Sequence, residues 1–318
     1  MSMYQLFTSI VSKGAKSNTY KFALAKFLLD YAKSQKLKEQ DYQISYTEIA
    51  TKFLEYYWFQ ECKYKFKQDF NKDKMPVVIG IIQKHCGTEY ISDSYEKYFQ
   101  KRKELQKKMI SEIEKRCLND VIPRFQPPEQ QDYYRHFHSR GKDAKSYKTS
   151  SEKYIVLNTQ ALKFLKEENE ILLKILVLEW AKFLEKTNFT PRLISKIEQM
   201  KDPPRRSLTK FREVLLEMTQ ECFYCATPLK DGDIHIDHFI PWSYIYEDAL
   251  WNLVPACSRC NLIKSDALAP QSCMEKMIIR NESYNLTTSK SDVEEYYENC
   301  YKAGFQILNQ EKLECRGA

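Results

Sequence analysis

The chain has 318 residues, of which 43% are hydrophobic and 29% are charged, and its formal net charge is +7. This length and balance exclude a chain that is disordered as a whole and favour two or three folded domains. No apolar run reaches 18 residues and the N-terminus lacks a signal-peptide layout, so we expect a soluble, cytoplasmic protein without membrane contact.

The first 128 residues predict a helical domain. Gly is scarce (7 residues) while Lys, Glu, Leu and Phe are common, a composition that favours helix over sheet. Apolar residues recur at helical spacing, and Ser45 or Thr47 is a suitable cap for the second helix. The helices expected here are 19–33, 44–60, one near 77–84 and one near 94–117. Such a domain would serve target recognition or partner docking.

A basic loop and helical connector are expected over residues 129–204. Within it, 155–164 begins as a strand and turns helical, and 168–188 is a long helix. Residues 133–148 hold five basic side chains and one acidic, a net +4, interleaved with aromatic residues. This pattern suits contact with a nucleic-acid backbone, and a solvated surface is the alternative. The candidate contacts, two of them from the basic run 201–212, are Arg135, Arg140, Lys142, Arg205 and Arg206.

The next predicted segment, 205–280, is a small module of two strands and a helix, followed by a helical tail over 281–318. A helix at 207–219 should lead into Cys222. Residues 234–236 and 252–256 should form the two strands, and the stretch after Cys257 should form the helix. The fold class expected overall is mainly α, with this module at the C-terminal end.

Four of the ten cysteines form two CxxC pairs, Cys222/Cys225 and Cys257/Cys260. Thiolates bind zinc tetrahedrally, and each CxxC pair supplies two of them at one turn. The two-pair pattern is far more specific than a single CxxC, and the absence of a secretion signal favours reduced thiols. We therefore expect a structural Zn²⁺ site that staples the module; four reduced core cysteines are the alternative.

Asp237 and His238 lie between the two pairs, and Asn261 follows the fourth cysteine directly. Phosphodiester hydrolysis needs a base for the attacking water and a cation that stabilises the leaving oxygen. A neutral histidine suits the first task near pH 7, and carboxylate and amide oxygens suit a hard divalent ion. Strand alternation places Asp237 and His238 on opposite faces, so a bend near Pro241 should bring both to one substrate.

The motifs CFYC, DHFIP, WNLVPAC and CSRCNLIKSD resemble those of the HNH, or ββα-metal, endonucleases. The four-cysteine form is also similar to the endonuclease VII-type resolvases of phages and to HNH nucleases of restriction and defence systems. The resemblance implies that His238 is the general base and that Asp237 and Asn261 hold one catalytic Mg²⁺ or Mn²⁺. It further implies that Asn252 orients His238 or supports its loop, and that the products carry 5′-phosphate and 3′-hydroxyl ends.

Other residues of the module have two interpretations each. Lys264 and Arg259 would bind the scissile or a flanking phosphate, or would be solvated helix charges. Asn252 would support the site, or would only cap the start of its strand. His235 shares a strand face with Asp237 and would reach the metal through water, or would be a supporting histidine.

The function favoured by the sequence is a metal-dependent DNA endonuclease of restriction or anti-phage defence type. A non-catalytic zinc module that binds nucleic acid is an alternative from another class, as is an RNA-cleaving nuclease. A subunit that stays silent until a partner activates it is a further alternative. Double-strand cutting by a site with one catalytic metal would call for a homodimer or two binding events.

Overall fold

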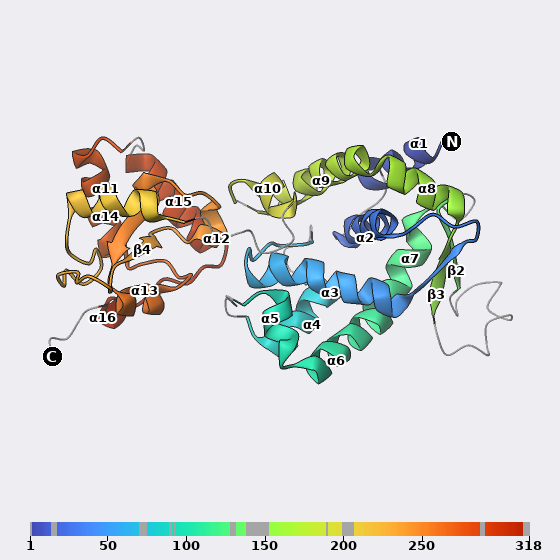
Figure 1. Ribbon diagram of the computed structural model, residues 1–318, viewed down its shortest axis with the longest axis horizontal. Coiled ribbons are helices and arrows are strands. Elements are labelled where there is room, and N and C mark those ends of the chain that lie inside the picture. Colours follow the sequence, from blue (N-terminus) through green and yellow to red (C-terminus); the bar gives the residue numbers. More distant parts are fainter. Residues whose placement is uncertain are drawn as a thin grey trace. The chain divides into compact units, whose positions relative to one another are not determined.

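Helices dominate the structure (Figure 1), as the scarcity of glycine predicts. The computed structural model describes residues 2–13, 18–69, 75–88, 91, 93–127, 132–137, 153–188, 190–198, 207–286 and 290–313. The chain divides into two compact units. The first comprises residues 1–187 with 197–201, and the second comprises 188–196 with 202–318. The four-part division expected from the sequence stays a prediction.

The first unit is a helical body with aromatic residues in its core. Phe22 stacks on Trp180 with ring centroids 5.7 Å apart, and Phe183 meets Phe22 edge-on, which ties the second helix of the chain to the last of this unit. Its helical elements are α1 (Met3–Thr8), the π-helix η1 (Ser9–Lys13), α2 (Tyr20–Ser34), α3 (Tyr46–Cys62), α4 (Val77–Cys86), α5 (Tyr95–Gln100), α6 (Lys103–Ile113), the π-helix η2 (Glu114–Leu118), α7 (Asn119–Phe125), α8 (Thr159–Glu167) and α9 (Asn169–Glu185).

The predicted helices of this unit are largely confirmed. Ser45 caps α3 in a capping box with Glu48, because each residue bonds the backbone N–H of the other. The helix expected near 94–117 is divided: α5 ends at Gln100, and α6 begins at Lys103 after the non-helical Arg102. Ser94, as N-cap, begins the first of the two pieces.

The first unit also contains a three-stranded antiparallel sheet, of which the sequence predicted only the strand that begins at residue 155. Its order is β1–β3–β2, formed by β1 (Tyr42–Ser45), β2 (Tyr134–Phe137) and β3 (Tyr154–Leu157). Ile44 pairs with Ile155, and both side chains are fully buried. The sheet thus brings the segment before α3 against the connector that precedes α8.

The second unit holds the module with the CxxC pairs. Its strands form an antiparallel pair, and its helices surround that pair. The elements are α11 (Thr209–Met218), β4 (His235–His238), α12 (Trp242–Ile245), the 3₁₀ turn η4 (Leu250–Asn252), β5 (Leu253–Ala256), α13 (Ser258–Lys264), α14 (Gln271–Ser283), α15 (Lys290–Lys302) and α16 (Gln310–Leu313). The strand–strand–helix order of the prediction is confirmed. The short α10 (Leu193–Glu198) spans the division between the units.

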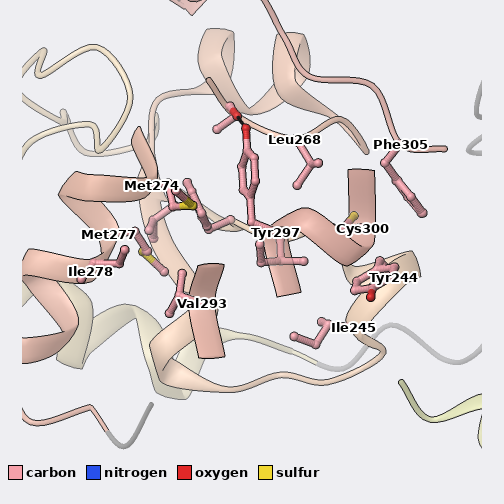
Figure 2. Close-up of a cluster of buried hydrophobic side chains, with 14 of the residues drawn as sticks. Tyr244, Ile245, Leu268, Met274, Met277, Ile278, Val293, Tyr297, Cys300 and Phe305 are labelled. Atoms are coloured by element: carbon pink, nitrogen blue, oxygen red, sulfur yellow. Dashed lines mark hydrogen bonds between the residues drawn. The ribbon is translucent and has the colours of Figure 1, made fainter. Parts of the chain in front are cut away.

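One hydrophobic cluster packs α12, α14 and α15 together behind the strands. Figure 2 shows Tyr244 and Ile245 from α12, Met277 from α14 and Tyr297 from α15 among its side chains. All four side chains are buried. The Tyr297 hydroxyl also donates to the carbonyl of Ala269 at 2.5 Å. Apolar burial and this bond fix the helices that follow the module against it.

None of the helices in the described part of the chain is long and apolar enough to cross a membrane.

Candidate active site and metal centre

The four cysteines of the two CxxC pairs lie together in the second unit. Their Sγ atoms are all within 4.8 Å of one another, and the Cys225 and Cys257 sulfurs are 3.9 Å apart. A zinc ion bound to four thiolates at about 2.3 Å separates the sulfurs by about 3.8 Å. Cys222 and Cys260 are fully buried, and the described cysteines form no disulfide. The cluster is thus sized and closed like a structural zinc site.

Local turns present the two pairs to each other. After the first pair, Ala226 takes a left-handed conformation (φ 58°) and its N–H donates to the Cys222 carbonyl at 2.8 Å. In the second pair, Cys257 is the N-cap of α13, so Cys260 follows within the first helical turn. Burial, followed by the charge on Cys222, raises the pKa of Cys260. A bound cation would stabilise the Cys260 thiolate and so offset the effects of burial and of the charge on Cys222.

The two strands and α13 form the layer structure that carries the polar residues. His235 pairs with Ala256 and Asp237 with Val254 in the antiparallel ladder. Successive side chains of a strand alternate in direction, so His235 and Asp237 share one face of β4, and His238 belongs to the other.

Asp237 is held on the face of β4 that meets α13. Its Oδ2 accepts a hydrogen bond from the Tyr224 hydroxyl at 2.5 Å and lies 3.2 Å from the Lys264 ammonium. Burial, and then the charge of Asp237, raise the pKa of Tyr224 well above its usual value, so the hydroxyl stays a donor. Both contacts use one oxygen. No hydrogen bond from the described residues reaches Oδ1, which leaves that atom for a cation.

Asn261 lies on the same face, one helical turn before Lys264. Its Nδ2 is 3.5 Å from Nδ1 of His235, which places the amide over the strand that carries Asp237. Carboxylate and amide oxygens from facing elements are the ligands that hard divalent ions prefer. Asp237 and Asn261 are the residues that would hold a Mg²⁺ or Mn²⁺ ion here, since both offer oxygen donors of this kind.

Lys264 has protein partners in place of the phosphate that we predicted. Its side chain is completely buried, and its ammonium donates to the His238 carbonyl at 2.6 Å as well as facing Asp237. A buried ammonium with two protein acceptors ties α13 to β4 and does not face a DNA backbone.

His238 contacts a different part of the unit. Its Nε2 is 2.9 Å from Oδ1 of Asp248, in the loop between α12 and η4. Both side chains are largely shielded from solvent, with 14% and 18% of their surfaces exposed. The catalytic base predicted from the sequence is therefore paired with a carboxylate that the sequence did not indicate.

Asn252 braces the loop after β4. The side chain is fully buried; its Oδ1 accepts from the Ile240 N–H at 2.7 Å, and its Nδ2 donates to the Ile240 carbonyl at 2.9 Å. These two bonds tie the segment before β5 to the loop after β4, and the role of Asn252 in the site stays a prediction. Arg280 of α14 holds the segment that carries Asn252 by donating to the carbonyls of Trp251 and Leu253.

Residues 222–269 match a family model described as HNH endonuclease. This segment contains all the residues of the candidate site described above except Arg280. This segment belongs to the HNH endonuclease family. No curated protein and no solved structure matches the chain. The HNH match accounts for the order of strand, strand and helix in this segment.

Of the remaining predicted contact residues, one lies on α13 of the HNH segment and the others lie outside this segment. Arg259 is exposed on the first turn of α13. Arg135, on β2 in the first unit, is exposed and pairs with Asp41 at 3.1 Å. The other predicted contacts lie outside the described residues: Arg140, Lys142, Arg205 and Arg206.

Three residues of the site escaped the sequence prediction. Tyr224 lies between Cys222 and Cys225, and the CxxC motif assigns a role only to the two cysteines. Asp248 and Arg280 have no spacing relation to the motif, because one lies in a loop and the other on a later helix. A hydroxyl or charge near a motif is too common to single out without the fold.

Proposed function

We propose that the protein is a metal-dependent endonuclease that hydrolyses phosphodiester bonds in DNA. The observation that carries the proposal is the arrangement on β4 of the HNH domain: Asp237 is fixed through one oxygen on the strand face where His235 contacts Asn261, and His238 follows it in the chain. The two side chains leave β4 on opposite faces, so the proposal places the phosphodiester across the end of the strand, where the chain bends toward Pro241.

In the proposed reaction His238 accepts the proton of a water molecule that attacks the phosphorus. The bond from phosphorus to the 3′-oxygen breaks, and the leaving oxygen takes a proton from solvent, which gives 5′-phosphate and 3′-hydroxyl ends. A divalent ion bound by Asp237 and Asn261 would supply stabilisation of the negative charge at the leaving oxygen. Neutral imidazole is an effective base near pH 7.

The other site residues would hold this arrangement in place. Asn252 fixes the backbone at Ile240, two residues after His238. The proposed Zn²⁺ at the four cysteines keeps α13, and with it Asn261, next to β4. Arg259, exposed at the start of α13, is the proposed phosphate contact of this helix.

Contacts to DNA outside the HNH domain are proposed for the basic positions Arg135, Arg140, Lys142, Arg205 and Arg206. Lysine and arginine side chains release counterions from a polyanion, so each such contact adds to the salt dependence of binding. The large helical unit is proposed to select the target, which would suit a nuclease of restriction or anti-phage defence. The nuclease itself is proposed to resemble the endonuclease VII type. A homodimer or an activating partner would complete double-strand cutting.

The deciding experiment compares wild-type protein with His238→Ala on supercoiled plasmid. Each is incubated with Mg²⁺, Mn²⁺ or EDTA, and single-stranded RNA is tested in parallel. We expect metal-dependent nicking or linearisation by the wild type and a loss of about 10²–10⁴-fold in the variant, the usual contribution of a general base.

Zinc content and thermal unfolding of His238→Ala serve as the control and should equal those of the wild type. A variant that cleaves at the wild-type rate would contradict the role of His238. A zinc-loaded, folded wild type that cleaves RNA but not DNA would contradict the DNA substrate and keep the chemistry.

A further inference from the structure

Asp248 is the one carboxylate that the described structure places against the His238 ring. The distance from Nε2 to Oδ1 is 2.9 Å, that of a good hydrogen bond. Because most of both side chains is shielded from water, the interaction is stronger than an equivalent pair on an open surface. Shielding of this degree distinguishes it from surface ion pairs, which contribute little.

The loop that carries Asp248 is held on both sides. Before it, Tyr246 adopts a left-handed conformation (φ 56°), donates its N–H to the Trp242 carbonyl at 2.7 Å and packs its ring on that tryptophan. After it, the Asn252 N–H donates to the Ala249 carbonyl at 2.9 Å. A non-glycine residue in the left-handed region costs free energy, and it persists where its surroundings determine it. The carboxylate is therefore presented to the ring from a defined position.

The pairing decides which ring nitrogen of His238 can act as a base. A neutral imidazole carries one proton, and an ionised carboxylate only accepts hydrogen bonds. With Asp248 at Nε2, the proton belongs on Nε2 and the lone pair on Nδ1.

We infer that Asp248 is a positioning residue for the nuclease reaction: it orients the His238 ring and selects the tautomer whose Nδ1 accepts the proton of the attacking water. The inference rests on the proposed function for its catalytic consequence. The tautomer itself is a property of the folded protein and can be measured without any cleavage.

Two variants of Asp248 and one control variant at Glu247 distinguish the positioning role from a purely structural one. Asp248→Ala removes the acceptor. Asp248→Asn keeps the shape but can turn its NH₂ group toward Nε2, which favours the wrong tautomer. Glu247→Gln is the matched control, because Glu247 is the adjacent carboxylate and forms an exposed ion pair with Arg192 at 2.7 Å.

The first measurement is the ¹⁵N chemical shifts of the histidine rings in the zinc-loaded full chain at pH 8, with His238→Ala to assign the signals. We expect the Nε2–H tautomer for His238 in the wild type and in Glu247→Gln, and a mixture or the Nδ1–H tautomer in both Asp248 variants. A wild-type ring in the Nδ1–H form, or tautomers that do not respond to Asp248, would overturn the inference.

The second measurement separates kcat from KM on plasmid DNA. We expect kcat to fall about 10–100-fold in Asp248→Ala, as for other residues that orient a reacting group, while KM changes little. The fall should be at least as large in Asp248→Asn, although that variant is the closer mimic in shape. A wild-type kcat in Asp248→Asn, with an unchanged melting temperature, would overturn the inference.

The two measurements also distinguish this inference from the proposed function. A wild type that cleaves no nucleic acid would defeat the proposed function, while the ring shifts would still confirm or overturn the tautomer. If Asp248→Ala does not fold, Asp248→Asn and the wild-type spectrum decide the outcome.

Discussion

The second unit contains the cysteine cluster and the proposed cation site around Asp237 and Asn261, and the two differ in almost every physical respect. The cysteine cluster is buried, uses four soft ligands and leaves no position open. The group around Asp237 and Asn261 has hard oxygen donors, two residues in place of four, and an oxygen left without a protein partner among the described residues. The cysteine cluster therefore serves to hold the fold, whereas the group around Asp237 and Asn261 is proposed for the chemistry. Helix α13 contributes residues to both.

The largest effect is expected from breaking the cluster. Cys257→Ser should lower zinc content and thermal stability together, because structural zinc binding supplies about 10–16 kcal/mol of free energy and is coupled to folding. Elemental analysis and thermal unfolding are the measurements. Cys273→Ser is the control, since Cys273 is a free cysteine outside the cluster. If the two variants keep equal zinc and equal melting temperatures, the structural role of the cluster is wrong.

A smaller and different effect is expected at the open site. Asn261→Ala should leave zinc and the melting temperature unchanged but weaken catalytic Mn²⁺ binding about 100-fold, the upper end of losses at metal sites. Calorimetric Mn²⁺ titration of the zinc-loaded protein tests this without cleavage, and Asn261→Asp, which keeps an oxygen donor, should retain binding. An unchanged titration in Asn261→Ala would remove this residue from the site.

The smallest effect tests the one residue that joins the two groups. Tyr224 lies inside a CxxC pair, yet its hydroxyl contacts Asp237. Tyr224→Phe should keep zinc and weaken Mn²⁺ binding about tenfold, equivalent to the roughly 1.5 kcal/mol of a hydrogen bond to a charged group. Tyr296→Phe, which removes a hydroxyl elsewhere in the unit, is the control. Loss of zinc in Tyr224→Phe would show that this tyrosine serves the cluster rather than the carboxylate.

The sequence was most informative where the determinants are local. Two cysteines in a CxxC pair lie within one turn, so Cys222 and Cys225 predict their own geometry, and the capping box at Ser45 marks the start of a helix. The donors Asp237, His238 and Asn261 were placed by their relation to these pairs. In the structure Asn261 contacts His235 of β4, and His238 has a partner of its own.

What the sequence did not reveal depends on contacts between distant segments. Ile44 is paired with Ile155 through strands of only four residues, and the first of these runs directly into a helix whose pattern dominates the segment. Lys264 was expected to bind a phosphate from its position on the helix, with a solvated charge as the alternative. Its burial follows from the carboxylate and the carbonyl that β4 presents beneath α13, which no spacing rule encodes.

Arg280 lies on α14, beyond the family match that ends at residue 269, yet it holds the turn before β5. Leu268 exchanges backbone hydrogen bonds of 2.9 Å with Gln306 and Leu308, and Leu313 packs beside the cysteines. The structural support of the HNH segment therefore runs past the end of the family match. A truncation at residue 269 would remove from it Arg280, Leu308 and Leu313.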